Sequence, residues 1–267
     1  MLRVAFTVAK EDLHSGDRLR EAKRLILKAK KLKADIICFG ECFPVQTSNP
    51  ETELNGISYL LNLSKKNKVA IIFGVGTPEY NKAVFVNRGN IIGEQLKGHF
   101  FANEKRKERA TNYEIFPFKK WKIGMLVCYD LFFPEPTRSL QIHGADIVFC
   151  PAHAFIGQSF WKSLATIRSM ENQIPVVLSG TVQKKLNMKG PGVAATPNSE
   201  SKEIIGNVEL MLIEVDLTYW KKLRSQQSNS LINAWAHIKK SINGPFVKDI
   251  NKEFLRRHAD DLRFLYK

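Results

Sequence analysis

The sequence predicts an α/β protein built from two tandem copies of one topology. Short apolar segments alternate with segments whose apolar residues recur at helical spacing. The order strand, helix, strand, helix, strand occurs in the first half of the chain and restarts at residue 121. Such alternation is typical of sheets covered by helices, and the repeat favours two sheets packed face to face with helices outside.

The first half begins with an apolar strand over 2–8, followed by an amphipathic helix over 17–33. A second apolar strand, 34–39, leads into a loop that contains Pro and Asn. The apolar stripe of the helix consists of Leu19, Ala22, Leu25, Ile26, Ala29 and Leu32. Next we expect a helix near 57–66, a strand over 69–74 and two short strands at 83–87 and 91–96.

The second half repeats this order and then continues into a basic tail. We expect strands at 122–127, 147–149 and 175–179, helices at 134–143 and 159–172, and two more strands near 192–195 and 208–215. No linker is long enough to separate two domains. We therefore expect a single domain over 1–267, with a core over 2–217 and a helical C-terminal extension over 218–267.

Composition argues against a membrane protein and against a metal or cofactor site. The apolar runs are too short to cross a bilayer, and the first of them continues into Lys10 without a cleavage site, so we expect a cytoplasmic protein with no membrane partner. Cys38, Cys42 and Cys150 lie in or beside apolar strands, as buried reduced thiols do. No Cys or His pair completes a zinc site with Cys38 and Cys42, and we expect neither metal nor cofactor.

The chain is strongly basic, with 41 Lys and Arg against 26 Asp and Glu, or a net charge of +15. Such a charge attracts nucleic acid non-specifically. The basic residues are scattered along the helical segments, however, and no aromatic-interleaved RNA motif or phosphate loop accompanies them. A solvated basic surface explains the charge better, so we expect no specific nucleic-acid partner.

Three polar residues follow predicted strands and are candidates for chemistry. Cys128 ends the strand 122–127, Glu41 follows the strand 34–39, and Lys97 follows the strand 91–96. Ligand sites in α/β proteins gather at the carboxyl ends of strands, where a thiol can face a cleft. Each residue also has an ordinary structural explanation: a buried thiol, a loop carboxylate and a surface lysine.

The segments around these residues resemble the three catalytic blocks of the nitrilase superfamily of carbon-nitrogen hydrolases. The blocks are ADIICFGE at 34–41, KGHFF at 97–101 and KIGMLVCYDLFFPE at 122–135, in the order of that family. Supporting matches are YNKA at 80–83, GAD at 144–146, CPA at 150–152, and Trp161 through Arg168, Glu171 and Asn172. The resemblance covers residues 2 to about 217.

The resemblance implies a four-layer α-β-β-α sandwich of two mixed sheets with an internal pseudo-two-fold repeat. It implies a triad in which Cys128 is the nucleophile and Glu41 the general acid and base. Lys97 and the backbone N–H after Cys128 would hold the oxyanion of each tetrahedral intermediate. The substrate would be a small amide, cleaved through a thioester with release of ammonia or amine.

Many members of the family carry a second glutamate after the lysine block. Glu104 matches it best, with Glu108 as the rival because residues 106–109 replace an aromatic residue and a Pro-Gly turn. Gly40 stands where Pro is usual, and Gln95-Leu96 where Tyr-Arg is frequent. None of these departures removes a reacting group.

Candidate substrate contacts are Tyr129, Phe132 and His153. Members that hydrolyse N-carbamoyl amino acids typically have arginines directly after the Cys-Tyr-Asp of the third block, where this chain has Leu131 and Phe132. An apolar lining makes an unpaired carboxylate costly to bury, so we expect a neutral linear amide. A substrate carboxylate could still be bound by a cation from another side, because Lys105, Arg106 and Arg109 follow the lysine block.

Other functions and assemblies remain compatible with the sequence. Alternatives are transfer of the acyl group to an amine, N-carbamoyl hydrolysis, or a non-catalytic binding protein on the same fold. We also expect a homodimer or larger homo-oligomer, because family members pair through helices that flank the sandwich. Apolar residues of the C-terminal segment at helical spacing could contribute: Leu231, Ile232, Trp235 and Ile238.

Overall fold

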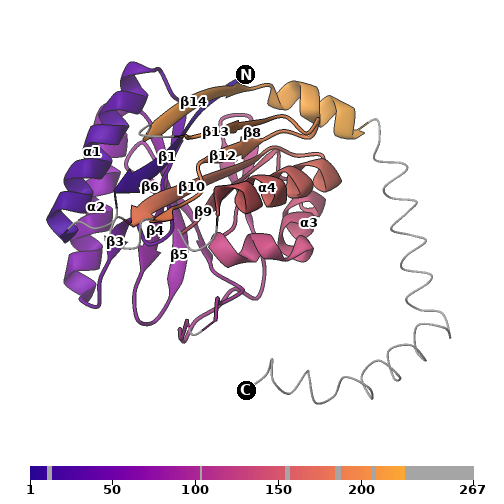
Figure 1. Ribbon diagram of the computed structural model, residues 1–267. Coiled ribbons are helices and arrows are strands. Elements are labelled where there is room, and N and C mark those ends of the chain that lie inside the picture. Colours follow the sequence, from indigo (N-terminus) through magenta and orange to yellow (C-terminus); the bar gives the residue numbers. More distant parts are fainter. Residues whose placement is uncertain (11–13, 103, 154–156, 184–187, 206–208, 226–267) are drawn as a thin grey trace, which may run out of the picture. The chain divides into compact units, whose positions relative to one another are not determined.

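The computed structural model describes residues 1–10, 14–102, 104–153, 157–183, 188–205 and 209–225 (Figure 1). The chain divides into two compact units, Met1–Trp220 and Lys221–Lys267. Of the second unit only residues 221–225 are described, and they are helical. The rest of the expected C-terminal extension lies outside the described residues, as does its apolar stripe of Leu231, Ile232, Trp235 and Ile238.

The first half of the chain forms one sheet with two helices. Its strands are ordered β6-β5-β4-β2-β1, with β3 paired to β4. One strand from the second half of the chain, β14 (Leu210–Val215), joins this sheet on the other side of β1. The elements are β1 (Leu2–Lys10), α1 (Ser15–Lys31), β2 (Ile36–Cys38), β3 (Pro44–Gln46), α2 (Pro50–Asn67), β4 (Ala70–Gly76), β5 (Asn81–Asn87) and β6 (Asn90–Leu96).

The second half forms a sheet of similar order, β7-β8-β9-β10, with β12 and then β13 beyond β10. Its elements are β7 (Ile115–Phe118), β8 (Trp121–Met125), the 3₁₀ helix η1 (Cys128–Phe132), α3 (Pro134–Ile142), β9 (Ile147–Pro151), α4 (Gln158–Asn172), β10 (Val176–Gln183), β11 (Met188–Lys189), β12 (Val193–Ala195), β13 (Ser201–Glu203) and β14 (Leu210–Val215).

The two sheets are joined where the carboxyl end of β1 reaches β10. Val8 pairs with Gly180 and Ala9 with Thr181 in parallel register, so the strand order continues from one sheet into the other. Figure 1 shows α1 and α2 on one side of the strands and α3 and α4 on the other. The expected α-β-β-α sandwich is confirmed.

Burial of one face explains why α1 lies on the first sheet. Ala22, Leu25, Ile26 and Ala29 are fully buried and share a core cluster with Ile37. Their three- and four-residue spacing places them on one face of the helix. Each fully buried Leu or Ile stabilises the fold by about 1.5–3 kcal/mol.

The helix α2 begins at Pro50, well before the expected residue 57. The Asn49 side chain caps it by accepting from the N–H of Glu51 at 2.8 Å and of Thr52 at 3.2 Å. Pro50 fits the first helical position because its missing N–H would have no partner there. The pair Asn49-Pro50 is therefore the start of the helix and not part of the preceding loop.

Some short strands were not expected from the sequence. β3, β7 and β13 have three or four residues each, too few for an alternating pattern to emerge. β3 is defined by its partner, since Pro44 and Val45 pair in parallel with Gly74 and Val75 of β4. Within the described residues, no helix has the length and apolar character needed to span a membrane.

Candidate active site

The three expected triad residues follow three different strands. Glu41 lies in the turn after β2, Lys97 directly follows β6, and Cys128 is the first residue of η1, just after β8. The side chain of Lys97 is only 2% exposed. A lysine this buried requires charged partners, so its structural explanation as a surface residue is wrong.

Two carboxylates hold the ammonium group of Lys97. Its Nζ donates to Glu41 Oε1 at 2.7 Å and to Glu104 Oε2 at 2.5 Å. Asn81, the first residue of β5, donates from Nδ2 to Glu41 Oε1 at 2.8 Å and to Glu104 Oε1 at 3.0 Å. Lys97, Glu41, Asn81 and Glu104 thus form a closed ring of hydrogen bonds, which we call the charge ring.

The structure brings Glu104, and not Glu108, to Lys97. Glu108 is exposed, and its backbone N–H donates to the carbonyl of Glu79. The Arg106 guanidinium lies on the outer side of Glu104, with Nε 3.5 Å from Oε1, and also donates to the carbonyl of Thr77. Glu104 is therefore placed between two cations.

The thiol of Cys128 is buried among charged groups. Burial raises the pKa of this thiol well above its ordinary value, the Glu41 carboxylate raises it further, and Lys97 offsets only part of the rise. The residue is only 2% exposed. The thiol is protonated at neutral pH, so attack requires a base. Glu41 is the group placed for this, because its carboxylate lies close enough to raise the pKa of the thiol by its charge.

Lys97 and Glu104, two charged members of the ring, are held ionised. For Lys97, burial opposes the charged form, but the charges of Glu41 and Glu104 outweigh it and raise the pKa. For Glu104, burial acts to raise the pKa, and the Lys97 charge together with the Asn81 and Lys97 hydrogen bonds lowers it overall. The site therefore keeps an ammonium group beside carboxylates at neutral pH.

The position of Glu41 depends on contact between the two halves of the chain. Its backbone N–H donates to the carbonyl of Ala152, just after β9, at 3.1 Å. A Cβ on the preceding Gly40 would lie 2.8 Å from the backbone of Gly180 in β10. The residue at this position must therefore be glycine, which explains the absence of the usual Pro.

A buried carboxylate connects the loop that contains Lys97 to the turn at Cys128. Asp130 is fully buried, and its Oδ1 accepts from the N–H of Gly98 at 3.0 Å and of His99 at 2.8 Å. Oδ1 also accepts from the Tyr113 hydroxyl at 2.9 Å. Its Oδ2 accepts from the N–H of Val127, the residue before Cys128, at 3.0 Å. The loop after β6 and the turn after β8 thus share one anchor.

Arg168 of α4 holds the end of η1. Its Nε donates to the carbonyl of Leu131 at 2.9 Å, and Nη2 donates to that of Phe132 at 2.7 Å. The last carbonyls of a helix lack partners within the helix, and a guanidinium can satisfy two of them at once. The match of Arg168 to the family pattern thus has a structural reason.

The candidate substrate contacts differ in their surroundings. The Tyr129 ring lies 4.6 Å from that of Phe132 and 5.3 Å from that of Phe101, so half-buried aromatic side chains follow the nucleophile. Leu131 is fully buried in the protein. His153 is half-buried in the loop after β9, next to residues 154–156, which the structure does not describe.

Sequence reasoning gave no role to Asn81, Asp130 or Arg168. Asn81 and Arg168 stood in segments that match the family, and Asp130 stood beside the nucleophile, but residue type alone did not indicate their contacts. Within the described ranges, no group of three or more His, Cys, Asp or Glu residues could hold a metal ion.

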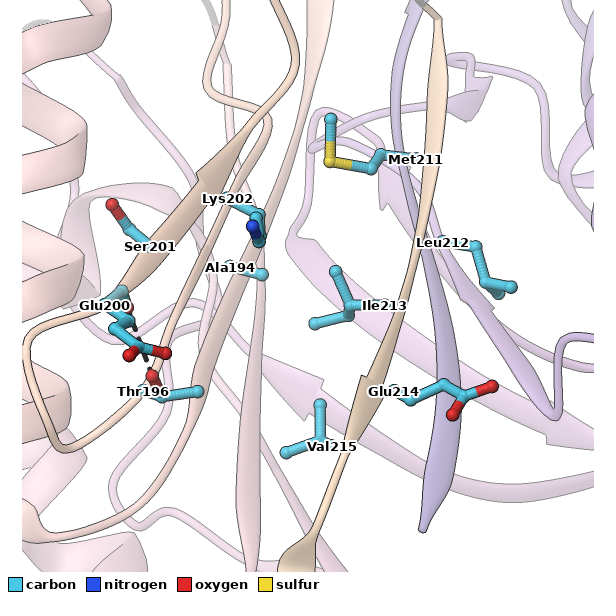
Figure 2. A pocket seen from close by; sticks show the side chains of 10 residues that line it. All are labelled: Ala194, Thr196, Glu200, Ser201, Lys202, Met211, Leu212, Ile213, Glu214 and Val215. Atoms are coloured by element: carbon cyan, nitrogen blue, oxygen red, sulfur yellow. Dashed lines mark hydrogen bonds between the residues drawn. The ribbon is translucent and has the colours of Figure 1, made fainter.

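A separate pocket lies between the β12–β13 hairpin and β14 (Figure 2). It has a volume of about 340 Å³ and contains none of the candidate catalytic residues. Met211, Ile213 and Val215 of β14 form its apolar side, and Lys202 lies across from them (Figure 2). Nothing about this lining indicates hydrolytic chemistry.

Comparison with known proteins gives a family match over most of the chain. The family model described as carbon-nitrogen hydrolase matches residues 14–223. A protein of Pyrococcus abyssi named nitrilase is 25% identical over 255 residues, covering 86% of this chain and 96% of the relative. An omega-amidase of Xenopus laevis is 26% identical, covering 79% of this chain and 87% of the relative.

Solved structures share the fold at low sequence identity. The crystal structure of a carbon-nitrogen hydrolase from Helicobacter pylori G27 superposes with a TM-score of 0.75 at 18% identity, covering 84% of this chain and 92% of that one. A mutant amidase from Nesterenkonia sp. AN1 in complex with butyramide gives a TM-score of 0.73 at 19% identity, covering 86% and 96% of the two chains.

Proposed function

The chain belongs to the carbon-nitrogen hydrolase family of the nitrilase superfamily, and from this premise we propose that it hydrolyses a small neutral amide through a thioester on Cys128. One observation carries the proposal: the buried Lys97 ammonium bridges Glu41 and Glu104, and the charges of Glu41 and Lys97 both act on the buried Cys128 thiol. We further propose that residues 2–217 form the catalytic core of this activity.

In the first step, Glu41 takes the proton of the Cys128 thiol as sulfur attacks the amide carbonyl carbon. The C–S bond forms, and the carbonyl oxygen becomes an oxyanion. An ammonium has three N–H donors, and in the described residues two of those on Lys97 bind Glu41 and Glu104. We assign the third N–H of Lys97, together with the backbone N–H of Tyr129, to the oxyanion.

In the second step, the C–N bond breaks and Glu41 gives its proton to the departing nitrogen, which leaves as ammonia or an amine. Glu41 then takes a proton from water, and the resulting hydroxide attacks the thioester carbonyl. The C–S bond breaks, the acid is released, and the proton returns to sulfur. If an amine replaced water in this step, the same residues would perform acyl transfer.

The two nearby arginines are engaged in contacts within the protein, which favours a neutral substrate. Arg106 binds the carbonyl of Thr77 and lies beside Glu104, and Arg109 packs over the Phe100 ring at 4.8 Å. Of the three cations that left a carboxylate site open in the sequence, Lys105, Arg106 and Arg109, the two arginines thus have partners within the protein. The butyramide complex of the Nesterenkonia amidase, in a protein of the same fold, supports a small uncharged amide.

The test is a mass spectrum of the intact protein incubated with propionamide, butyramide, an aliphatic nitrile and an N-carbamoyl amino acid, with ammonia release measured in parallel. We expect an acyl adduct on Cys128 and ammonia from the neutral amides. A tenfold higher kcat/KM for the N-carbamoyl amino acid than for every neutral amide would contradict the substrate class. Absence of both adduct and ammonia with all of these compounds would favour a binding protein on this fold.

A further inference from the structure

Asn81 contacts every other member of the charge ring. Its side-chain Nδ2 donates to one oxygen of Glu41 and one of Glu104, and its backbone carbonyl accepts from the N–H of Lys97 at 2.8 Å. The residue is 1% exposed. One buried neutral side chain therefore holds two carboxylates, while its backbone positions the lysine between them.

The orientation of the amide follows from its partners. Ionised carboxylates only accept hydrogen bonds, so the NH₂ group must face Glu41 and Glu104. The amide oxygen then faces the Cys42 thiol, whose Sγ donates to Oδ1 at 3.7 Å. Both N–H bonds of the amide are occupied, and an aspartate of the same size could supply neither.

We propose that Asn81 is a positioning residue that keeps the Cys128 thiol able to react. By binding Oε1 of Glu41 together with Lys97, it leaves Oε2 of Glu41 for the thiol proton. By bridging Glu41 to Glu104, it holds two like charges on one ammonium without adding a charge of its own. The inference rests on the proposed function, because it concerns activation of the same nucleophile.

The charge balance of the site explains why this position suits a neutral donor. The groups facing Asn81 and its partners are the anions Glu41 and Glu104, the cations Lys97 and Arg106, and the thiols of Cys42 and Cys128. Burial, followed by the Glu41 charge, already raises the pKa of Cys128. A further anion in the ring would oppose loss of the thiol proton still more.

Asn81→Asp therefore exchanges two donors for acceptors and adds a negative charge without changing size. We expect deprotonation of Cys128 to become harder, so the acid side of its pH–reactivity profile moves to higher pH. The matched control is Asn87→Asp, the same exchange at the other end of β5, where the residue is half-buried and outside the charge ring.

The experiment measures the rate of alkylation of Cys128 by iodoacetamide from about pH 5 to pH 11, read by peptide mass spectrometry, so that the range extends above the ordinary pKa of a thiol. It needs no substrate. We expect Asn81→Asp to react at least tenfold more slowly than the parent at pH 7, with its profile moved upward by about one pH unit, since one unit corresponds to a tenfold change. Asn87→Asp should stay within twofold of the parent.

A second variant keeps the test decisive if Asn81→Asp does not fold. Asn81→Ser removes the two N–H donors without adding charge, and its alkylation should also slow by at least threefold. The inference is wrong if the folded Asn81→Asp, or Asn81→Ser where the former does not fold, reacts at the parent rate. It is also wrong if Asn81→Asp reacts slowly with an unchanged pH profile, because packing alone would do that. A parent that alkylates normally but hydrolyses no amide would refute the proposed function, and the comparison between variants would still decide the role of Asn81.

Discussion

Cys128 has a backbone φ of 48°, in the left-handed region that residues with side chains seldom adopt. Such a conformation costs on the order of 1 kcal/mol or more and persists only where the surroundings enforce it. Here the preceding N–H, that of Val127, is held by Asp130, and the Cys128 carbonyl accepts from the Cys150 thiol at 3.9 Å. The chain therefore turns sharply at Cys128. This conformation distinguishes Cys128 from the buried thiols of Cys38 and Cys150, whereas Cys42 has a similar φ of 52°.

The first prediction separates Cys128 from another buried cysteine. Cys128→Ala should abolish amide hydrolysis and acyl-adduct formation while the protein stays folded, because only the sulfur atom is removed. Cys38→Ala, within β2, should retain activity and lower the free energy of unfolding by about 1 kcal/mol. Activity and urea unfolding of both variants are the measurements. Normal turnover in Cys128→Ala would refute the mechanism.

The second prediction ranks the carboxylates. Glu41→Gln should lower kcat about 10²–10⁴-fold, because it removes the group that we propose as general acid and base. Glu104→Gln removes a charge that binds Lys97 at 2.5 Å and should lower kcat about 10- to 100-fold through misplacement of the ammonium. Glu108→Gln, on an exposed residue, serves as the control and should stay near the parent. Steady-state kinetics with one neutral amide measure all three effects. A larger loss of kcat in Glu108→Gln than in Glu104→Gln would contradict the ranking.

The sequence indicated the candidate reacting residues more clearly than the residues that position them. Glu41, Lys97 and Cys128 follow apolar strands and lie in recognisable blocks, so pattern and resemblance both indicated them. Asn81 and Asp130 act through contacts to residues far away in the chain, such as Asn81 to Glu104. An Asn at a strand start and an Asp in a turn have many ordinary uses, so residue type alone indicated no partner.

At the scale of elements, the site depends on loops tied to each other rather than on any single strand or helix. The lysine loop after β6 and the turn before η1 share Asp130, and η1 is held from outside by Arg168 of α4. A Cβ on Gly98 would lie 2.2 Å from the Tyr113 hydroxyl. The close approach of these segments explains why glycine follows Lys97.

The third prediction tests this link between elements. Asp130→Asn turns one acceptor oxygen into an NH₂ group that faces backbone N–H donors, so it should lower the free energy of unfolding by about 2–3 kcal/mol and also lower kcat. Asp146→Asn is the matched control, since Asp146 is another buried aspartate that accepts a backbone N–H, that of Lys122 at 2.9 Å. It should lose stability with kcat nearly unchanged. An unchanged kcat in Asp130→Asn would show that the link does not position the site.

Helices and longer strands were predictable, and the short strands were not, for a physical reason. The helices α1 and α4 bury one face over several turns, which leaves a clear period in the sequence. A strand of three residues such as β3 has no period of its own and is defined by hydrogen bonds to β4. Those bonds depend on the tertiary structure and leave no local trace.

At the scale of the described core, the candidate site exists only because the two halves meet. The N–H of Glu41 binds the carbonyl of Ala152, and Gly40 lies against Gly180 where β1 joins β10. Glu41 and Lys97 come from the first half, and Cys128 from the second. The repeat that predicted two sheets therefore also explains why no single half contains the complete set of reacting groups.

The last prediction concerns assembly. Several large apolar side chains are exposed on the outer side of α3 and α4: Ile142 (59%), Phe160 (42%), Ile167 (51%) and Met170 (43%). Phe160 and Ile167 are seven residues apart and so lie on one face of α4, and a cluster of this kind commonly marks a protein interface.

We expect a homodimer formed through this surface, as the family resemblance predicts. Ile167→Glu should convert the dimer to a monomer with unchanged helix content, because it would bury an unpaired charge in the interface. Leu54→Glu on α2, a residue that is 66% exposed on the opposite side of the sheets, should leave the dimer intact. Light scattering at micromolar concentration measures the mass of each variant. A monomeric parent would contradict the dimer, whereas a dimeric Ile167→Glu protein would place the interface elsewhere.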